Sequence, residues 1–574
     1  MHASASKPAS SLAVRLGVAA LLTLHTALLL WTNRSSAITF DEYAHLPAGV
    51  AYWRHGALDI YNLTPPLLRF WAAAPLLAMD PRVPDPALVR ADSADARHWI
   101  YAEHFLRANA QIDPGRYVQF FTVGRAALIP LLLIGGWIVY RWAAALHGEI
   151  AGLAALALYV TCPNLIAHGA LLTTDAGTSV ALLAAAWLAW RFGAQPTLLR
   201  GALLALAIAA AHLCKFTALL LWPALLATLT LQARGAGWRG LAHRGLGLFA
   251  AAAATWLVVN AVYGFSGVGR PLSEFALQSQ LLTGVARQFP WFPSPLARDV
   301  LIGFDVQKFE TEGQYPALLL GEVYSGARWY FYPVALALKL PLATLALLAL
   351  AATSARGRLD HALPLIFGWI LLAGMTLGTQ INIGIRYILP ILPLLYVVIG
   401  GLWRPATGWR RTAATVLLAL AVIEPLAQAP HYLAFMNALG GGPTKAYRQL
   451  NDSNYDWGQD LDKLGAWMHE NEQQQVILCY FGSVDPRVYG VTYSSLLEPD
   501  DESEYVVVSS YFVAGLDHWL RTPRGRSEER VSLPYHRELA ELAPAARVGR
   551  TLFVYRRSEF EQLVVDFFDR RGVP

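Results

Sequence analysis

Long apolar runs alternate with short polar loops over most of the chain, and this alternation is the first indication of its fold. A run of about 20 predominantly apolar residues can cross a bilayer as a helix, because the hydrocarbon layer is about 30 Å thick. Eleven segments fit this guide, of which the fifth and sixth are short. We therefore expect an α-helical polytopic membrane protein with about eleven transmembrane helices. The predicted spans lie near residues 12–31, 119–141, 150–168, 175–191, 199–213, 216–232, 245–263, 331–353, 362–379, 387–403 and 411–428.

Basic residues in the loops orient the predicted spans. Short cytoplasmic loops of membrane proteins are enriched in Lys and Arg, and here the basic residues gather at every second loop. We therefore expect the amino terminus in the cytoplasm and, with an odd number of spans, the carboxy terminus outside. Three large polar pieces then share the outer side, residues 32–118, 264–330 and 431–574. The orienting residues are Arg141, Arg191, Arg200, Arg234, Arg239, Arg244, Arg356, Arg358, Arg404, Arg410 and Arg411.

The carboxy-terminal part of the chain has a different character. After Pro430 charged and polar residues become frequent, and no later apolar run is long enough to span a membrane. Short segments rich in β-branched and aromatic residues predict strands, and one segment with helical spacing predicts a helix. We therefore divide the chain into a transmembrane domain, residues 1–430, and a small extracytoplasmic α/β domain, residues 431–574. The predicted strands lie at 476–481, 505–510 and 551–555, and the predicted helix lies at 461–469.

The first outer loop contains two helical segments that are too short to span. Residues 43–55 have apolar side chains at helical spacing with polar ones between, which is typical of a helix that lies in the membrane interface. Residues 67–79 form a second short apolar run. Thr64 can cap that helix, with Pro65 or Pro66 in its first turn. Turn formation alone is the alternative explanation of the paired prolines.

Composition excludes a soluble protein. Hydrophobic residues make up 55% of the 574 residues and charged residues only 15%, against about 25% charged residues in soluble globular domains, and the mean hydropathy is +0.37. The net charge of +5 is small for this length and gives no reason to expect nucleic acid as a partner. Cys162, Cys214 and Cys479 show no paired spacing, so they indicate neither a disulfide framework nor a zinc site.

Asp41 and Glu42 form an acidic pair shortly after the first predicted span, in a chain that is otherwise poor in charge. Carboxylates are costly to cover with membrane, so a pair at this position is a candidate for a functional site. An acidic turn that simply faces water is the alternative, and position alone does not decide between them.

Three further charged residues lie at the predicted outer ends of spans. Asp175, at the start of the fourth span, either caps that helix or belongs to a site. Lys215 joins two short apolar helices, and its ammonium either reaches toward the interface or pairs with an anion. The same choice applies to Arg386 before the tenth span, where a planar guanidinium would suit a phosphate oxygen.

Five short motifs, all on the predicted outer face, occur in order along the chain. They are Asp41-Glu42, Pro65-Pro66-Leu67, Thr173-Thr174-Asp175-Ala176, Lys215-Phe216-Thr217 and Arg386-Tyr387-Ile388-Leu389-Pro390. Each motif is weak alone, but together, over roughly residues 10–430, they resemble the polyprenyl-phosphate-dependent glycosyltransferases of the GT-C superfamily. Within it the sequence is most similar to the protein O-mannosyltransferases and the bacterial aminoarabinose transferases.

This resemblance implies the transfer of a sugar from a polyprenyl-phosphate carrier to an acceptor on the outer face of a bacterial cytoplasmic (inner) membrane. Asp41 matches the aspartate taken as the base that removes the acceptor's proton, and Glu42 would orient or assist it. Lys215 and Arg386 are the cations available to the departing phosphate. A single displacement would invert the anomeric centre. Other residues assigned to a donor or acceptor site are His45, Pro65, Pro66, Arg69 and Asp175.

Two segments outside these motifs have open roles. Residues 451–460, the densest motif of the carboxy-terminal domain, contain Asp456 and Trp457. This motif either contacts the acceptor from above or forms a turn and helix cap rich in Asn and Asp. Aromatic residues at 289–293 and 328–332 suit a sugar face or a prenyl chain, but we favour membrane anchoring, the ordinary role of aromatic residues at the interface.

Two other classes of protein fit part of the sequence. A lipid-linked sugar flippase or transporter also has many spans and buried cations, but it typically shows internal repeats and a site near the membrane centre. A non-catalytic scaffold would need neither Asp41 nor Lys215. The expected partners are a polyprenyl-phosphate-sugar donor, membrane lipids and an acceptor that is a protein, lipid A, another glycolipid or a polysaccharide. No ligand cluster indicates a metal cofactor, although a carboxylate pair does not exclude a divalent ion.

Overall fold

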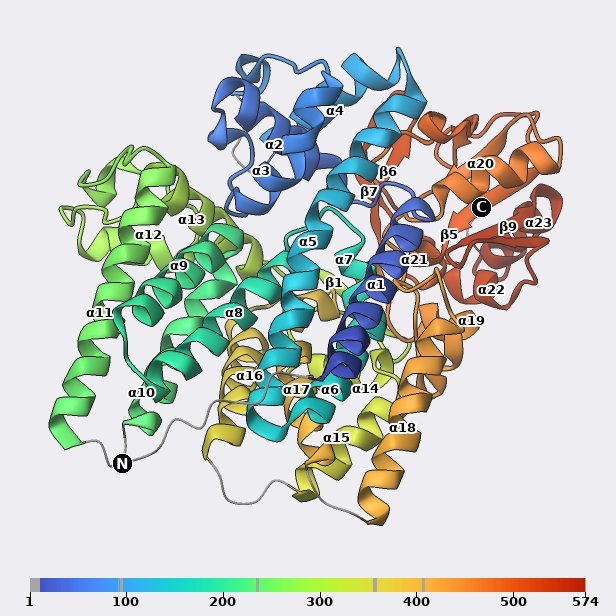
Figure 1. Ribbon diagram of the computed structural model, residues 1–574. Coiled ribbons are helices and arrows are strands. Elements are labelled where there is room, and N and C mark those ends of the chain that lie inside the picture. The colour runs from blue at the N-terminus through green and yellow to red at the C-terminus, as the bar shows by residue number, and fades with distance from the viewer. Residues whose placement is uncertain are drawn as a thin grey trace.

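The computed structural model describes residues 11–90, 92, 96–233, 237–354, 359–404 and 408–572. Figure 1 shows a bundle of helices that carries three further pieces of chain at one end: the helices of the first outer loop, the segment between α11 and α14, and the carboxy-terminal region with its strands. The predicted class, a mostly helical chain with an α/β region at its carboxy terminus, is confirmed. Of the orienting basic residues, Arg234, Arg356 and Arg358 lie outside the described residues.

Three helices in the described part of the chain are individually long and apolar enough to cross a membrane. Two helix pairs pass the same test together but are bent, by 56° and by 116°. Length and composition therefore support three spans, or up to five, and the count of about eleven stays a prediction. The three helices are α1 (Leu12–Arg34), α5 (Pro114–His147) and α11 (Gly237–Val262), and the bent pairs are α6 (Glu149–Thr161) with α7 (Pro163–Gly169) and α14 (Phe331–Lys339) with α15 (Leu342–Ser354).

Two expected spans are bent. The chain turns by 56° between α6 and α7, within the expected span 150–168, and by 116° between α14 and α15, within the expected span 331–353. Pro341 lies in the second break, where its missing N–H and its ring prevent the helix of α14 from continuing. The other helices of the bundle are α8 (Asp175–Ala194), α9 (Leu198–Cys214), η4 (Phe216–Leu220), α10 (Leu221–Gln232), α16 (Leu359–Gly378), η6 (Ile385–Ile388), α17 (Ile391–Ile399), η7 (Gly400–Trp403) and α18 (Trp409–Leu426).

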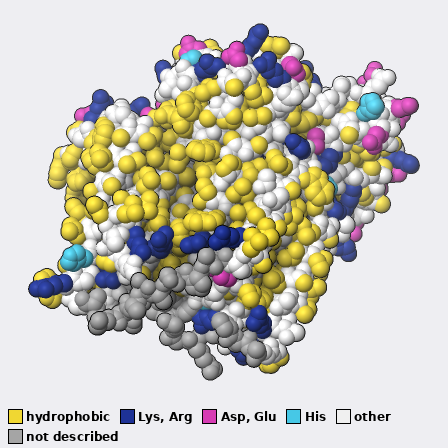
Figure 2. All heavy atoms as spheres, in the orientation of Figure 1, with side chains coloured by type: hydrophobic (Ala, Val, Ile, Leu, Met, Phe, Trp, Pro, Cys, Tyr) yellow, Lys and Arg dark blue, Asp and Glu magenta, His cyan; other side chains and the backbone are white. Residues whose placement is uncertain are grey.

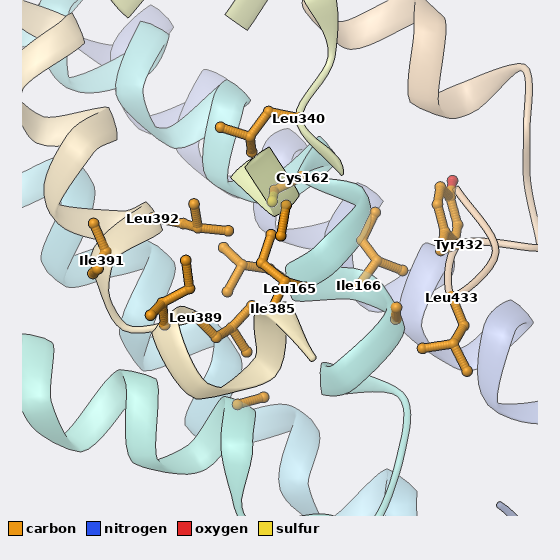
Figure 3. Close-up of a cluster of buried hydrophobic side chains, with 14 of the residues drawn as sticks. Cys162, Leu165, Ile166, Leu340, Ile385, Leu389, Ile391, Leu392, Tyr432 and Leu433 are labelled. Atoms are coloured by element: carbon orange, nitrogen blue, oxygen red, sulfur yellow. The ribbon is translucent and has the colours of Figure 1, made fainter. Parts of the chain in front are cut away.

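The core of the bundle holds the short helix η6 in place. Leu165 and Ile166 of α7 belong to the same buried cluster as Ile385 and Leu389, and Figure 3 shows their side chains close together. Packing of this kind gives each buried side chain many van der Waals contacts and allows it few alternative positions. The backbone on both sides of Arg386 is therefore fixed against α7.

The first outer loop folds into a compact layer of α2 (Glu42–His55), α3 (Leu67–Ala73), η2 (Ala74–Met79) and α4 (Arg97–Ala110). The helix expected at 43–55 is confirmed, but its first ten residues are all buried, so α2 is a core helix of this layer and not a surface-lying one. The expected helix at 67–79 divides into α3 and η2 before Pro75. The expected cap is wrong: Pro66 precedes the helix, and the Thr64 hydroxyl instead accepts a hydrogen bond from Arg69.

The carboxy-terminal region contains a five-stranded sheet in the order β4-β3-β5-β9-β8. β3 (Val476–Cys479), β5 (Tyr505–Ser509) and β9 (Leu552–Arg556) confirm the three expected strands, and α20 (Leu461–Glu470) confirms the expected helix. β3 pairs in parallel with β4 and β5, whereas β9 runs antiparallel to β5 and β8. Elements that the sequence pattern missed are β4 (Tyr493–Ser495), β8 (Ala546–Val548) and a separate hairpin of β6 (His518–Thr522) and β7 (Gly525–Val531).

The segment between α11 and α14 contains α12 (Gln280–Gln288), α13 (Arg298–Glu312) and the hairpin β1 (Pro316–Leu319)–β2 (Glu322–Ser325). On the face shown in Figure 2, hydrophobic side chains cover a broad middle zone, and charged side chains lie mainly above and below it. This distribution is typical of a protein that spans a membrane, with its water-exposed surface at both ends.

Candidate functional site

Four charged side chains from separate parts of the chain meet where the bundle joins the outer pieces. The Arg386 Nη1 lies 2.5 Å from Asp41 Oδ2 and 3.8 Å from Asp175 Oδ2. The Lys215 ammonium donates to Asp175 Oδ1 at 2.6 Å. Asp41 is the most open of the four, with 23% of its side chain exposed, against 2% for Asp175. Two carboxylates and two cations thus form one network with Asp41 at its open edge.

Each of these residues lies at the end of an element. Asp41 immediately precedes α2, and its side chain makes no capping hydrogen bond. Asp175 is the first residue of α8, and its carboxylate binds Lys215 and lies near Arg386. Lys215 has an extended backbone between α9 and η4. Arg386 lies in η6, which follows an extended Gly384. The breaks between helices therefore bring the charges together.

Aromatic rings cover the two cations. The guanidinium carbon of Arg386 lies 4.4 Å from the centre of the Trp457 ring, and the Lys215 Nζ lies 4.8 Å from that of Tyr387. Such cation–π contacts stabilise a positive charge that has lost part of its water. The buried Nε of Arg386 has no hydrogen-bond partner among the described residues. The guanidinium therefore retains one donor that the protein does not use.

Glu42, the neighbour of Asp41, belongs to a different network. Its side chain is 0% exposed and forms a two-pronged ion pair with Arg125 of α5, at 2.6 and 2.7 Å. It also accepts hydrogen bonds from the N–H of Leu172 and from Thr39. Burial alone would raise the pKa of Glu42, but the Arg125 charge and these donors outweigh it and hold the pKa below its ordinary value. A buried Glu42 held by Arg125 suits the expectation that Glu42 orients or assists Asp41, and this role stays a prediction.

Arg125 ties the segment before α2 to the bundle. Besides Glu42, its guanidinium donates to the carbonyl oxygens of Asn33 at 3.0 Å and of Ser36 and Ala37 at 2.8 Å. This set of bonds fixes the chain from the end of α1 to the start of α2. The Glu42 bond to Leu172 extends it toward the turn that carries Asp175.

A second buried cluster lies behind the four charges. His45 stacks on Tyr61 at 4.8 Å between ring centres, and the Arg69 guanidinium lies 4.2 Å from the centre of the same Tyr61 ring. Burial, reinforced by the charge of Arg69, lowers the pKa of His45 well below its ordinary value, so the ring is neutral. The Nδ1 of His45 has no partner among the described residues. His45 is therefore a neutral hydrogen-bonding group in the same region as Asp41.

Pro65 and Pro66 form a buried turn in front of α3. Arg69 holds this turn from inside, because its guanidinium donates to the Thr64 hydroxyl at 2.6 Å and to the carbonyl oxygens of Tyr61 and Thr64 at 2.9 Å. These contacts support the alternative of turn formation for the two prolines and give Arg69 an internal role.

Asp456 is an internal support of the carboxy-terminal domain. Its buried carboxylate accepts hydrogen bonds from the hydroxyls of Ser509 and Ser510 and from the N–H groups of Tyr511 and Gly458. Burial raises its pKa to about 7, although these hydrogen bonds act in the opposite direction. All of these partners are buried groups of the same domain. They therefore support the alternative in which the motif forms a turn and helix cap, and not one in which Asp456 contacts an acceptor.

Trp457 has a different place, between the domain and the charge network. Its ring lies over Arg386, and its carbonyl oxygen accepts a hydrogen bond from the N–H of Phe40 at 3.0 Å. The N–H of Ala37 likewise donates to the carbonyl oxygen of Gln459 at 2.9 Å. The 451–460 motif therefore binds the segment before Asp41 through backbone hydrogen bonds and holds it in position.

Sequence reasoning missed two cations that shape this region, Arg125 and Lys339. The buried Lys339 of α14 donates to the carbonyl oxygens of Leu433 at 2.8 Å and Asn454 at 2.6 Å, which ties the bundle to the 451–460 motif. Both residues are charges within apolar helices, which is itself a signal of a specific partner. No group of three or more His, Cys, Asp or Glu residues suited to a metal occurs in the part of the chain that the structure describes.

Comparisons with known proteins give structural neighbours only. No family model matches the chain, and no curated protein matches it. Two crystal structures of ArnT from Cupriavidus metallidurans are 12% identical to it. The one bound to undecaprenyl phosphate covers 95% of this chain and 98% of its own at a TM-score of 0.48, and the apo one covers 94% and 98% at 0.47. Both are of the aminoarabinose transferase class that the sequence resembles.

Proposed function

We propose that this protein is a membrane glycosyltransferase that moves a sugar from a polyprenyl-phosphate carrier to an acceptor on the extracytoplasmic face, with inversion. The observation that carries the proposal is the network of Asp41, Arg386, Asp175 and Lys215, in which a partly exposed carboxylate lies against cations suited to a phosphate. The sequence resemblance supplies the class of donor. We place the protein in a bacterial cytoplasmic membrane.

In the proposed reaction Asp41 acts as the general base. As the acceptor hydroxyl gives its proton to Asp41, its oxygen bonds to the anomeric carbon and the bond from that carbon to the phosphate oxygen breaks. The polyprenyl phosphate leaves with the bonding electrons. Arg386 and Lys215 stabilise the negative charge that develops on it. One displacement of this kind inverts the anomeric centre.

The resting ion pair explains how the base becomes available. Arg386 holds the Asp41 carboxylate at 2.5 Å in the free protein, so the guanidinium occupies one of its oxygens. A carrier phosphate that binds Arg386 competes with Asp41 for the guanidinium. The arrival of the donor therefore releases the Asp41 carboxylate from its ion pair at the moment when the base is needed. In this scheme Glu42 acts through Arg125 as a positioning residue.

The test is transfer from a defined donor by the purified full-length chain in lipid vesicles. Asp41→Asn is expected to lower the release of free polyprenyl phosphate by about 100-fold or more, the usual contribution of a general base. The matched control is Asp80→Asn, which changes an aspartate of the same loop whose side chain is 87% exposed. Asp41→Asn with full activity would overturn the assignment. Donor movement across the membrane without release of polyprenyl phosphate would identify a flippase. The absence of both activities would favour a scaffold.

A further inference from the structure

A cavity lies beside the segment that carries Asp41, between the first outer loop and the carboxy-terminal domain. Its volume is about 330 Å³. One wall comes from α4, with Trp99 and Glu103, and the opposite wall from the β6–β7 hairpin, with Trp519 and Arg526. Phe40, the residue before Asp41, lines it as well. In Figure 1 both α4 and the hairpin lie at this end of the bundle.

Several aromatic side chains line this cavity, among them Phe40, Trp99 and Trp519. Phe40 lies 5.1 Å from Trp99 and 5.2 Å from His518 between ring centres, both at steep angles. Mainly apolar walls with a few fixed polar groups are typical of small-ligand sites, and this cavity is at the small end of the usual range of about 300–1,000 Å³. The flat, weakly polar face of a sugar ring would cover such aromatic surfaces well.

The charged groups of the cavity have a positive excess. Glu103 is the carboxylate among its lining residues, and it is already bound by Arg521 at 2.7 Å, by Arg107 at 3.0 Å and by the hydroxyl of Tyr43 at 2.7 Å. Arg526 lies 3.7 Å over the Trp519 ring and has no ion-pair partner among the residues that the structure describes. A ligand with a negative group would therefore find an unused guanidinium at this wall.

We propose that this cavity binds the acceptor, and that the acceptor is an acidic glycan whose anionic sugar unit occupies the cavity. This proposal rests on the proposed function. Neighbouring Cα atoms are about 3.8 Å apart, so Phe40 places the cavity wall one residue from the base Asp41. A sugar unit held against Trp519 and Arg526 would direct the next unit of the glycan, with its free hydroxyl, toward Asp41. The hairpin β6–β7 is then the specificity element.

Binding to the full-length chain in lipid nanodiscs tests the proposal by titration calorimetry. The probes are tetragalacturonate and maltotetraose carrying a terminal phosphate as acidic glycans, neutral maltotetraose, and laurate. We expect either acidic probe to bind at least tenfold more tightly than neutral maltotetraose, with the carboxylate and phosphate arms showing which anion is preferred. Arg526→Gln should remove this tenfold preference, and Trp519→Leu should weaken binding of both kinds of glycan. Arg524→Gln, on the turn of the same hairpin and outside the cavity lining, should change neither the preference for acidic glycans nor the strength of glycan binding.

Three outcomes would overturn the proposal: no binding of either acidic probe, equal effects of Arg526→Gln and Arg524→Gln, or preferential binding of laurate. The result is separable from the proposed function. If release of polyprenyl phosphate depends on Asp41 but acidic glycans do not bind in the cavity, the proposed reaction stands and the proposed acceptor site is wrong. If acidic glycans bind through Arg526 but no polyprenyl phosphate is ever released, the site stands and the reaction fails.

Discussion

Asp41 and Glu42 show how differently two adjacent carboxylates are used. Asp41 precedes α2 and Glu42 begins it, and successive residues of a helix point in directions about 100° apart around its axis. Asp41 turns to Arg386 and keeps 23% of its side chain exposed, whereas Glu42 turns inward to Arg125 and is fully buried. The Asp41 carboxylate is therefore accessible from outside the protein, whereas the Glu42 carboxylate holds the segment that carries both residues.

Replacement of Glu42 by glutamine should destabilise the protein more than it alters the chemistry. The neutral amide would leave the buried Arg125 charge without its counter-ion, and loss of one partner of a buried pair costs about 3–5 kcal/mol. Thermal unfolding of the purified protein measures this. Replacing both residues, as Glu42→Gln with Arg125→Met, should cost less than the sum of the single changes. Exposed Glu274→Gln is the control, and an equally small effect at both positions would contradict the role given to the pair.

Asp456 should make stability depend on pH. Its folded pKa of about 7 lies above the value of about 4 in an unfolded chain, so the folded state binds the proton more tightly. Its contribution is fully present below about pH 4 and is lost as the pH rises toward 7, by up to about 1.4 kcal/mol per pH unit. Asp456→Asn removes this dependence. The unchanged protein should therefore lose stability relative to Asp456→Asn across this range in unfolding curves at several pH values, and parallel behaviour of the two would contradict the prediction.

The residues of the candidate site were predictable in part. Asp41, Asp175, Lys215 and Arg386 stood out because each is a charge at the predicted outer end of a span, and the structure places all four in one network. Position along the chain did not show which of the two carboxylates would be exposed, although the family resemblance singled out Asp41 as the base. The role of Arg125 was also hidden, since Glu42 and the backbone carbonyls that it binds lie more than 80 residues earlier in the chain.

At the scale of elements, periodicity located the helices better than it described their shape. The carboxy-terminal strands and α20 lie where β-branched and helical patterns placed them. The sharp turn between α14 and α15 and the division of 67–79 into α3 and η2 depend on single prolines inside apolar runs. Burial of the first ten residues of α2 was unexpected, because the partners of its polar residues, such as Arg125 of α5 for Glu42 and Tyr61 for His45, come together only in the folded protein.

The crossing of α2 and α3 should tolerate no side chain at Gly49. A Cβ atom there would lie 2.4 Å from the carbonyl oxygen of Arg69, so Gly49→Ala must push the two helices apart. Overpacking of this kind costs about 1–3 kcal/mol, and the displaced α2 would also move Asp41 and reduce transfer. Gly284→Ala is the matched control, because nothing lies within 4 Å of a Cβ there and alanine favours the helix. Equal behaviour of the two variants in unfolding and transfer assays would contradict the close crossing.

At the scale of the whole molecule, the first outer loop and the carboxy-terminal domain form one body. The Phe40 N–H donates to Trp457 and the Ala37 N–H to Gln459, and the Lys463 ammonium donates to the carbonyl oxygen of Ser35 at 2.7 Å. The site consequently combines side chains of the bundle with supporting contacts from a domain that lies more than 400 residues further along the chain. Neither part contains the complete site alone.

The contact between the first outer loop and the carboxy-terminal domain allows a test of which side of the membrane carries the site, whatever the number of spans. The segment before Asp41 is hydrogen-bonded to the 451–460 motif. The carboxy-terminal domain and the site must therefore lie on the same side of the membrane, whether the chain crosses it five or eleven times. Alkaline phosphatase, active only outside the cytoplasm, should therefore be active when fused to the carboxy terminus.

The matched control is the same enzyme fused after Gln195, in the loop between α8 and α9 that Arg191 and Arg200 assign to the cytoplasm, where it should be inactive. A green fluorescent protein that folds only in the cytoplasm should give the opposite pair of results. The reverse pattern at both fusion points would put Asp41 on the cytoplasmic side. A polyprenyl-phosphate donor used outside the cell membrane would then be excluded, whatever the activity measured in detergent.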